Sequence, residues 1–106
     1  MKSVPKVSVV LPVLAPTPFL RAMTEFCIKT LRTHADNPFE LVMVEANGHY
    51  FDQIPYGSST ASHEIDKYLN FDPGIGGIKE TNHGIRAASG EFIVTTGNDV
   101  IVPPHW

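Results

Sequence analysis

The sequence predicts an α/β fold in which a mostly parallel sheet is flanked by helices. Short apolar segments rich in Val alternate along the chain with segments of helical spacing, an order typical of parallel strands joined by right-handed crossovers. The apolar segments also lack alternating polar residues, as strands buried on both faces do. The 106 residues, 42% hydrophobic and 18% charged, fit a single folded domain over residues 1–106.

The first half of the chain predicts a strand, a helix and a second strand. Residues 7–13 (VSVVLPV) are short, apolar on both faces and closed by proline, as a central strand is. Thr17 and Pro18 then provide an N-cap and a first helical residue, and apolar residues recur at helical spacing to about His34. Residues 39–45 (FELVMVE) follow a proline break and predict a second buried strand that ends on an acid.

The middle of the chain gives overlapping predictions. Residues 46–62 are rich in Gly, Pro, Ser, Asn and Tyr without a clear period and predict a loop. Apolar residues four apart predict a short helix over residues 61–69, whereas residues 68–71 (YLNF) predict a strand. Both cannot hold, because the two segments share residues.

The last third of the chain predicts a turn, a helix and a strand. Residues 72–77 (DPGIGG) have the composition of a turn. Residues 81–89 predict a helix with Gly90 at its C′ position. Residues 91–96 (EFIVTT) predict the last strand, buried on both faces like the others.

Charge and cysteine content exclude several classes of protein. Eight Lys and Arg against eleven Asp and Glu give a net charge of −3 without a basic cluster, so we expect no nucleic-acid partner. No run approaches the ~18 apolar residues of a transmembrane segment. The single cysteine, Cys27, excludes an intrachain disulfide and lies in an apolar helical pattern where burial is expected. These observations favour a reducing, cytoplasmic compartment, with membrane association of a longer form left open.

The predicted strand order indicates where a ligand would bind. We expect the strands at 7–13, 39–45 and 91–96 to be parallel neighbours, with 7–13 in the centre. In such sheets, ligands bind beyond the carboxyl ends of the strands. The segments to inspect are therefore residues 12–15, 45–48 and 97–100.

Four segments in this order resemble the first half of a family 2 glycosyltransferase of GT-A (Rossmann-like) fold. The resemblance covers nearly the whole chain, although no single segment is specific to that family. The segments are residues 7–13, residues 39–45, residues 82–93 (NHGIRAASGEFI), and residues 97–100 (GNDV) followed by residues 103–106 (PPHW).

The resemblance implies a nucleotide site after the first two strands. The family uses backbone groups of the turn at Pro12, Val13 and Leu14 to hold the base. It carries an Asp at the end of the second strand, where this chain has Glu45, followed by Asn47, which we include in the site. A carboxylate of either length accepts hydrogen bonds from a base or ribose. The alternatives are a plain strand end and a solvated strand-end acid.

The resemblance also implies a phosphate contact near the last predicted helix. Asn82 matches the Asn at the family's helix start, and Lys79 lies one turn earlier. Free N–H groups at a helix N-terminus near a cation suit a phosphate. The alternatives are a helix N-cap for Asn82 and a solvated charge for Lys79. The nearby glycines do not form a phosphate-binding loop signature.

The metal site implied by the resemblance lies at Asp99. Gly97, Asn98 and Asp99 occupy the family's DxD position, where carboxylates hold Mg²⁺ or Mn²⁺ against the donor diphosphate. Gly97 and Asn98 depart from the acids often found there, so metal affinity without donor should be weak. The alternative for Asp99 is a turn acid. The histidine spacing argues against zinc, and no nucleophile motif favours a hydrolase.

We therefore expect the donor-binding half of a metal-dependent, inverting glycosyltransferase. Its donor would be a nucleotide-diphosphate sugar and its acceptor a glycan, a lipid or a protein. The family's catalytic base lies downstream of the metal motif, so we expect a truncated domain that is inactive alone and could self-associate through an exposed face. The alternative is a non-catalytic nucleotide-binding or interaction module of the same fold. An acidic base and further strands in a longer chain would favour the transferase.

Overall fold

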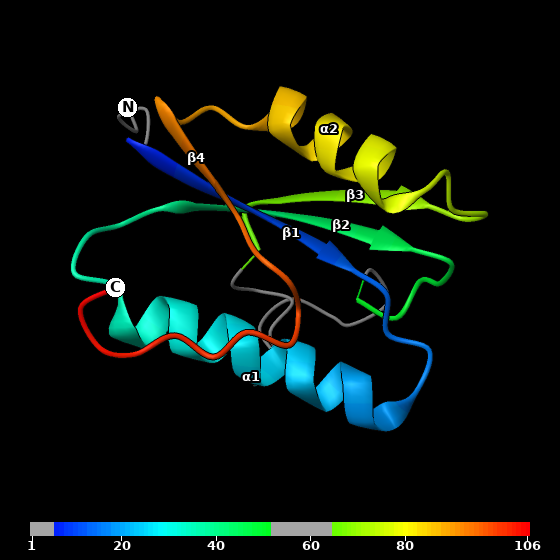
Figure 1. Cartoon of the computed structure of the whole chain (residues 1–106), viewed down its shortest axis with the longest axis horizontal. Coiled ribbons are helices and arrows are strands. Elements are labelled where there is room, and N and C mark those ends of the chain that lie inside the picture. The colour runs from blue at the N-terminus through cyan, green and yellow to red at the C-terminus, as the bar shows by residue number, and fades with distance from the viewer. Residues whose placement is uncertain (1–5, 52–64) are drawn as a thin grey trace.

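The computed structural model describes residues 6–51 and 65–106, which form a sheet with a helix on each face. Figure 1 shows the longer helix on one side of the sheet and the shorter helix on the other. The elements, in chain order, are β1 (Val7–Val13), α1 (Pro18–His34), β2 (Glu40–Ala46), β3 (Lys67–Phe71), α2 (Gly77–Ala87) and β4 (Phe92–Thr95).

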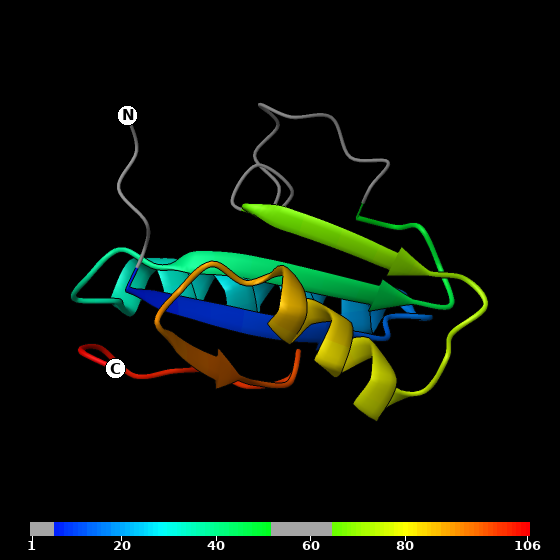
Figure 2. The same ribbon diagram turned by 90° about the horizontal axis from the view of Figure 1, so that it is seen from above.

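The four strands form one parallel sheet in the order β3-β2-β1-β4 (Figure 2). β1 lies between β2 and β4, which confirms the predicted central position of residues 7–13. In this register Val13 is the partner of Glu45, so the ends of β1 and β2 lie side by side. The loops that leave their carboxyl ends therefore begin at one edge of the sheet.

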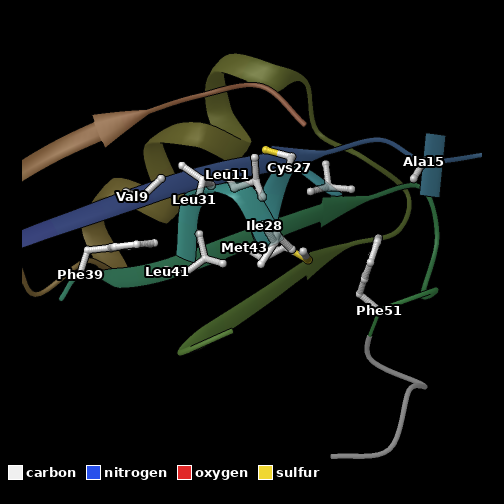
Figure 3. Close-up of a cluster of buried hydrophobic side chains, with 11 residues drawn as sticks. Val9, Leu11, Ala15, Cys27, Ile28, Leu31, Phe39, Leu41, Met43 and Phe51 are labelled. Atoms are coloured by element: carbon white, nitrogen blue, oxygen red, sulfur yellow. The ribbon is translucent and has the colours of Figure 1, made fainter. Parts of the chain in front are cut away.

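The main core lies between α1 and the sheet, where the apolar residues of the two central strands meet the buried face of the helix (Figure 3). The helix bounds match the predicted range. The Thr17 hydroxyl accepts a hydrogen bond from Leu20 N at 3.2 Å, so the expected N-cap forms. The labelled core residues are Val9, Leu11, Ala15, Cys27, Ile28, Leu31, Phe39, Leu41, Met43 and Phe51.

A smaller core lies between α2 and the other face of the sheet. Val10, Val42 and Val44 point to this side because alternate residues of a strand face opposite layers. Gly84 brings α2 close to the strands: a β-carbon there would lie 2.6 Å from Val10 Cγ1 and 2.8 Å from Val44 Cγ2. The sheet is thus covered on both faces over β1 and β2, which explains why these two strands read as continuous apolar runs.

The prediction of a helix over residues 81–89 is wrong at both ends. α2 begins at Gly77, with Gly76 as its N-cap, and ends before the C-cap Ala88, so Gly90 is not at C′. The early start has a local cause, because the Glu80 carboxylate accepts hydrogen bonds from the N–H groups of Ile75 and Gly76 at 2.9 and 3.3 Å. Asn82 therefore lies inside the helix and is not its N-cap.

The overlapping predictions for the middle of the chain resolve in favour of a strand. Lys67–Phe71 form β3, so Leu69 cannot belong to a helix over residues 61–69. Residues 61–64, and all of the predicted loop 46–62 beyond Phe51, lie outside the described residues. Ala46 ends β2, and residues 47–51 form no regular element, as predicted. The predicted turn at residues 72–77 is present up to Gly76 and includes a cis Asp72-Pro73 bond.

The prediction that the last strand is buried on both faces is also wrong. All four residues of β4 are exposed, and the strand is one residue shorter at each end than expected. β4 is a terminal strand of the sheet, and neither helix layer reaches over it (Figure 2). The strand is therefore apolar in sequence, but no described residues bury it.

The segment after β4 returns along α1 (Figure 1). His105 N donates to His34 O at 2.9 Å, and Trp106 Nε1 donates to Leu31 O at 3.0 Å. The Trp106 ring also meets Phe39 edge to face, with 5.3 Å between the ring centroids. This segment therefore packs along one side of α1 and against Phe39, just before β2. Neither described helix has the length and apolar character needed to cross a membrane.

Candidate functional site

Two neighbouring cavities lie at the carboxyl edge of β1 and β2. The first, the β2 cavity, has a volume of about 250 Å³, and the second, the glycine-turn cavity, about 330 Å³. Ala46 and Asn47 line both, so the cavities adjoin. The β2 cavity is lined by Ala15, Pro16, Arg21, Glu45, Ala46, Asn47, Gly48, His49 and Tyr50. The glycine-turn cavity is lined by Pro12, Val13, Leu14, Ala46, Asn47, Gly74, Gly76, Gly77, Glu80 and Asn98.

These cavities bring together six of the ten residues that the sequence predicted for the nucleotide site. The other four, Lys79, Asn82, Gly97 and Asp99, line neither cavity. The six are Pro12, Val13, Leu14, Glu45, Asn47 and Asn98.

Glu45 is a buried carboxylate whose oxygens are used by its own loop. It is only 2% exposed, which contradicts the alternative of a solvated strand-end acid. Its two oxygens accept hydrogen bonds from Tyr50 N and Phe51 N, both at 3.1 Å, and Tyr68 OH donates to Oε1. Carboxylate hydrogen bonds to N–H groups are among the stronger ones in proteins. Glu45 therefore holds the loop that forms part of the wall of the β2 cavity.

Asn47 connects the loop after β2 to the glycine turn. Its backbone has φ 54°, in the left-handed region that Asn tolerates better than most residues. Its N–H donates to Phe71 O at 2.9 Å, and its side-chain oxygen accepts from Gly74 N at 2.7 Å. Asn47 thus holds the boundary between the two cavities.

Arg21 is a cation of the β2 cavity that the sequence analysis did not identify. Its Nε donates to Ala15 O at 3.1 Å, and its guanidinium lies 4.6 Å from the centroid of the Tyr50 ring. These contacts hold a flat, charged and partly apolar surface at the cavity wall. The sequence signal was weak, because Arg21 stands in the first turn of α1 without any motif around it.

Glu80 is a carboxylate of the glycine-turn cavity that the sequence analysis also missed. It is 6% exposed and lines the cavity beside Asn47 and Asn98. Its position four residues after the N-cap Gly76 could have indicated a side chain folding back onto the helix start. Because the helix was predicted to begin at residue 81, Glu80 fell outside it.

The turn after β4 is tied to α1 through its neighbours. Asn98 Nδ2 donates to Thr24 Oγ1 at 2.9 Å and to Leu14 O at 3.5 Å. Cys27 Sγ lies 3.6 Å from Gly97 O. Cys27 is fully buried, as predicted, and burial raises the pKa of its thiol to about 11, with the charge of Asp99 acting in the same direction. The thiol therefore stays protonated and serves packing.

No protein-family model matches the chain, and no curated protein matches it. Among solved structures, the chain is similar to S. aureus TarS (residues 1–349), a GT-A-type glycosyltransferase, with a TM-score of 0.64 and 20% identity. The match covers 89% of this chain and 27% of the TarS chain. The chain has a glycosyltransferase-like fold. With this coverage, the chain spans about a quarter of the length of the TarS chain.

Within this glycosyltransferase-like fold, the predicted metal ligand Asp99 is an exposed acid in the turn after β4. The described residues contain no group of three or more His, Cys, Asp or Glu side chains that could hold a metal ion. A hard divalent cation takes six or more oxygen ligands, many of which can be water or phosphate. Asp99 therefore does not form a metal site by itself, and a cation held there would need its other ligands from elsewhere.

Lys79 and Asn82 lie on the outer surface of α2. Both are exposed, whereas Glu80 and Gly84, on the face toward the sheet, are buried. The start of α2 at Gly77 lines the glycine-turn cavity, but its N-terminal charge is already opposed by the Glu80 carboxylate. The helix N-terminus, whose N–H groups were expected to bind a phosphate at Asn82, therefore lies about one and a half turns before that residue.

Proposed function

We propose that this chain is the donor-binding part of a glycosyltransferase and binds a nucleotide-diphosphate sugar across the carboxyl edge of its sheet. The observation that carries the proposal is the pair of adjoining cavities at the ends of β1 and β2, beside the Asn98 and Asp99 turn. Ligands of parallel α/β sheets collect at this edge. The glycosyltransferase-like fold supports the same assignment.

The proposed orientation of the donor follows the order of the two cavities. The base lies in the β2 cavity, against the surface of Arg21 and Tyr50 and within reach of the backbone after β1. The nucleoside then crosses the boundary at Asn47, and the diphosphate points toward Asp99. The chain offers no cationic residue in the glycine-turn cavity among its described lining residues, so a divalent cation would neutralise much of the diphosphate charge.

In a transfer reaction, this half of the site would hold the donor and stabilise the departing nucleoside diphosphate. Mg²⁺ or Mn²⁺, when bound, would supply positive charge at the leaving group. Asp99 would anchor that charge, and Asn98, held by Thr24, would keep the turn in place. The acceptor would be a glycan, a lipid or a protein whose hydroxyl is deprotonated by a base outside the described site.

The proposal predicts that nucleoside diphosphate binding depends on a divalent cation through Asp99. In titration calorimetry, UDP or GDP should bind the wild-type chain more tightly with Mn²⁺ than without it. The variant Asp99→Ala should lose this dependence, because it removes the carboxylate that anchors the cation. Loss of a metal ligand should weaken metal-assisted binding by at least the ~10- to 100-fold that second-shell changes cost.

His105→Ala is the control for this experiment. His105 follows Asp99 in the same segment but contacts Asp36, with 2.6 Å between Nδ1 and Oδ1, at the C-terminal end of α1, and it lines neither cavity. Its removal should leave the Mn²⁺ dependence unchanged. Metal-dependent diphosphate binding by Asp99→Ala would show that the metal assignment is incorrect.

A second candidate is a nucleotide-binding or interaction module of the same fold without catalysis. Gly97 and Asn98 favour it, because neither supplies a charge beside Asp99, and so do the exposed apolar residues of β4. This candidate predicts binding of the diphosphate that Mn²⁺ does not improve. The calorimetry described above therefore separates the two.

A further inference from the structure

We propose that Glu80 reads the ribose of the bound nucleotide, with its free carboxylate oxygen accepting hydrogen bonds from the 2′- and 3′-hydroxyls. The inference rests on the proposed function and assigns the glycine-turn cavity to the ribose. It makes the site selective for ribonucleotides over nucleotides that lack these hydroxyls. Neither the resemblance nor the sequence pattern pointed to this residue.

The two oxygens of Glu80 are in different situations. Oε2 accepts from Ile75 N at 2.9 Å and from Gly76 N at 3.3 Å, which fixes the carboxylate against the turn. Oε1 has no donor among the described residues. No side-chain oxygen in the described part of the chain is both fully buried and without a hydrogen-bond partner, so Oε1 remains accessible. Because Glu80 lines the glycine-turn cavity and is otherwise buried, the cavity is where that oxygen is reached.

The rigidity of the site favours recognition of a ligand group. A carboxylate held by two N–H groups does not need to be ordered again when a ligand binds. Gly74 allows the turn to approach Glu80 and Asn47 closely, because a β-carbon there would lie 2.8 Å from Glu80 Oε2 and 2.9 Å from Asn47 Nδ2. The carboxylate is thus held in place on the wall of the glycine-turn cavity before any ligand binds.

The chemistry of the glycine-turn cavity selects a neutral hydrogen-bond donor. A phosphate would meet the negative charge of Glu80 in a cavity with no described cationic lining residue. Hydroxyl groups, in contrast, donate to a carboxylate without a charge penalty. The glycine-turn cavity also lies between the β2 cavity, proposed for the base, and Asn98, which precedes Asp99. In a nucleoside diphosphate, the group between base and phosphate is the ribose.

Glu45 cannot perform this role in the arrangement observed. An acid at the end of the second strand is the usual partner of ribose hydroxyls in dinucleotide-binding sheets. Here both Glu45 oxygens accept hydrogen bonds from the chain itself. Glu80 supplies the accessible carboxylate oxygen that Glu45 lacks, from the opposite side of Asn47.

The test compares UDP and GDP with their 2′,3′-dideoxy forms by titration calorimetry in the presence of Mn²⁺. The wild-type chain should bind each ribonucleotide about tenfold more tightly than its dideoxy form, the order expected for hydrogen bonds to a charged group. Glu80→Gln should lower this ratio, because its amide oxygen can still accept from the turn while the charged acceptor facing the ligand is replaced by a neutral N–H donor. Glu91→Gln removes an exposed carboxylate outside both cavities and should keep the ratio.

The outcomes separate this inference from the proposed function. Equal binding of ribo and dideoxy forms by the wild-type chain overturns the role of Glu80, even if no variant can be purified, and leaves donor binding intact. The role of Glu80 is also overturned if Glu80→Gln keeps the ratio. It is likewise overturned if Glu80→Gln weakens the binding of GDP and dideoxy-GDP equally, because the carboxylate would then contact the base. Absence of binding by every nucleotide overturns the proposed function together with this inference.

Discussion

The polar residues at the carboxyl edge of the sheet divide into those that the fold uses and those that keep a free group. Glu45 uses both carboxylate oxygens within its own loop, and Asn98 donates its amide hydrogens to Thr24 and Leu14. Glu80 keeps one accessible oxygen, and Asp99 is exposed. A ligand can interact only with the second kind without breaking bonds that hold the site. Residue identity alone does not show this difference.

Gly97 provides a test of the metal assignment at the scale of one residue. A β-carbon there would lie 3.0 Å from Asp99 Oδ1, the mobile end of an exposed side chain. We predict that Gly97→Asp raises the affinity for Mn²⁺ without nucleotide on the order of tenfold, because a second carboxylate adds a charged oxygen ligand. The affinity can be measured by electron paramagnetic resonance titration of free Mn²⁺.

Gly97→Asn is the matched control for that variant. It has nearly the same size as Asp but adds no charge, so it should leave the Mn²⁺ affinity without nucleotide close to the wild-type value. If Gly97→Asp bound Mn²⁺ no better than Gly97→Asn, residue 97 would not face the cation.

At the scale of elements, a buried polar network joins three strands to the connection between α2 and β4. The Glu40 carboxylate accepts from Ser8 Oγ and Ser89 N, both at 2.8 Å, and its other oxygen lies 3.2 Å from Lys67 Nζ. Burial raises the pKa of Glu40, but the hydrogen bonds from Ser89, Ser8 and Lys67 together lower it below its ordinary value. The network lies at the end of the sheet opposite the cavities, where it fixes the path of the chain into β4.

We predict that Glu40→Gln lowers the free energy of unfolding at neutral pH by about 1–3 kcal/mol, because buried donors lose a charged acceptor. A depressed folded-state pKa contributes stability that is present above the unfolded value of 4.5 and is lost as pH falls through the folded value. The difference between wild type and Glu40→Gln should therefore narrow below pH 4.5. Urea unfolding across that range measures it.

Glu91→Gln serves as the control for this prediction, since Glu91 is exposed. It should change the unfolding free energy little at any pH. A difference between wild type and Glu40→Gln that stayed constant on acidification would show that the charge of Glu40 does not stabilise the network.

The elements themselves were largely predictable, and the exceptions have physical causes. β1, β2 and α1 were found because apolar residues buried on the appropriate faces leave a clear period in the sequence. The start of α2 was missed because it depends on a side chain, Glu80, that folds back onto a glycine turn. The site followed the same rule: its edge was predictable from strand order, whereas Arg21 and Glu80 entered it through tertiary contacts that no local pattern records.

At the scale of the whole molecule, the described sheet ends in two edge strands, β3 and β4, and β4 is the one whose residues are all exposed. β4 pairs only with β1, at the end of the sheet, and its three apolar residues Phe92, Ile93 and Val94 are 55%, 39% and 41% exposed. No charged residue lies within the strand. Edge strands of native proteins usually carry charges, prolines or bulges that prevent pairing with another chain. The surface around β4 therefore has the properties of an interface.

We predict that the chain self-associates through β4, and that Ile93→Lys weakens this association by about tenfold or more. A charge on the exposed strand opposes both edge pairing and burial of the apolar surface, which are the two sources of attraction there. Sedimentation velocity over a concentration series measures the effect. Ile78→Lys is the matched control. Ile78 is 82% exposed on α2, so the variant introduces the same substitution at an exposed position away from the strand. A wild-type chain that remains monomeric at every concentration, or an equal effect of both variants, would show that β4 is not the interface.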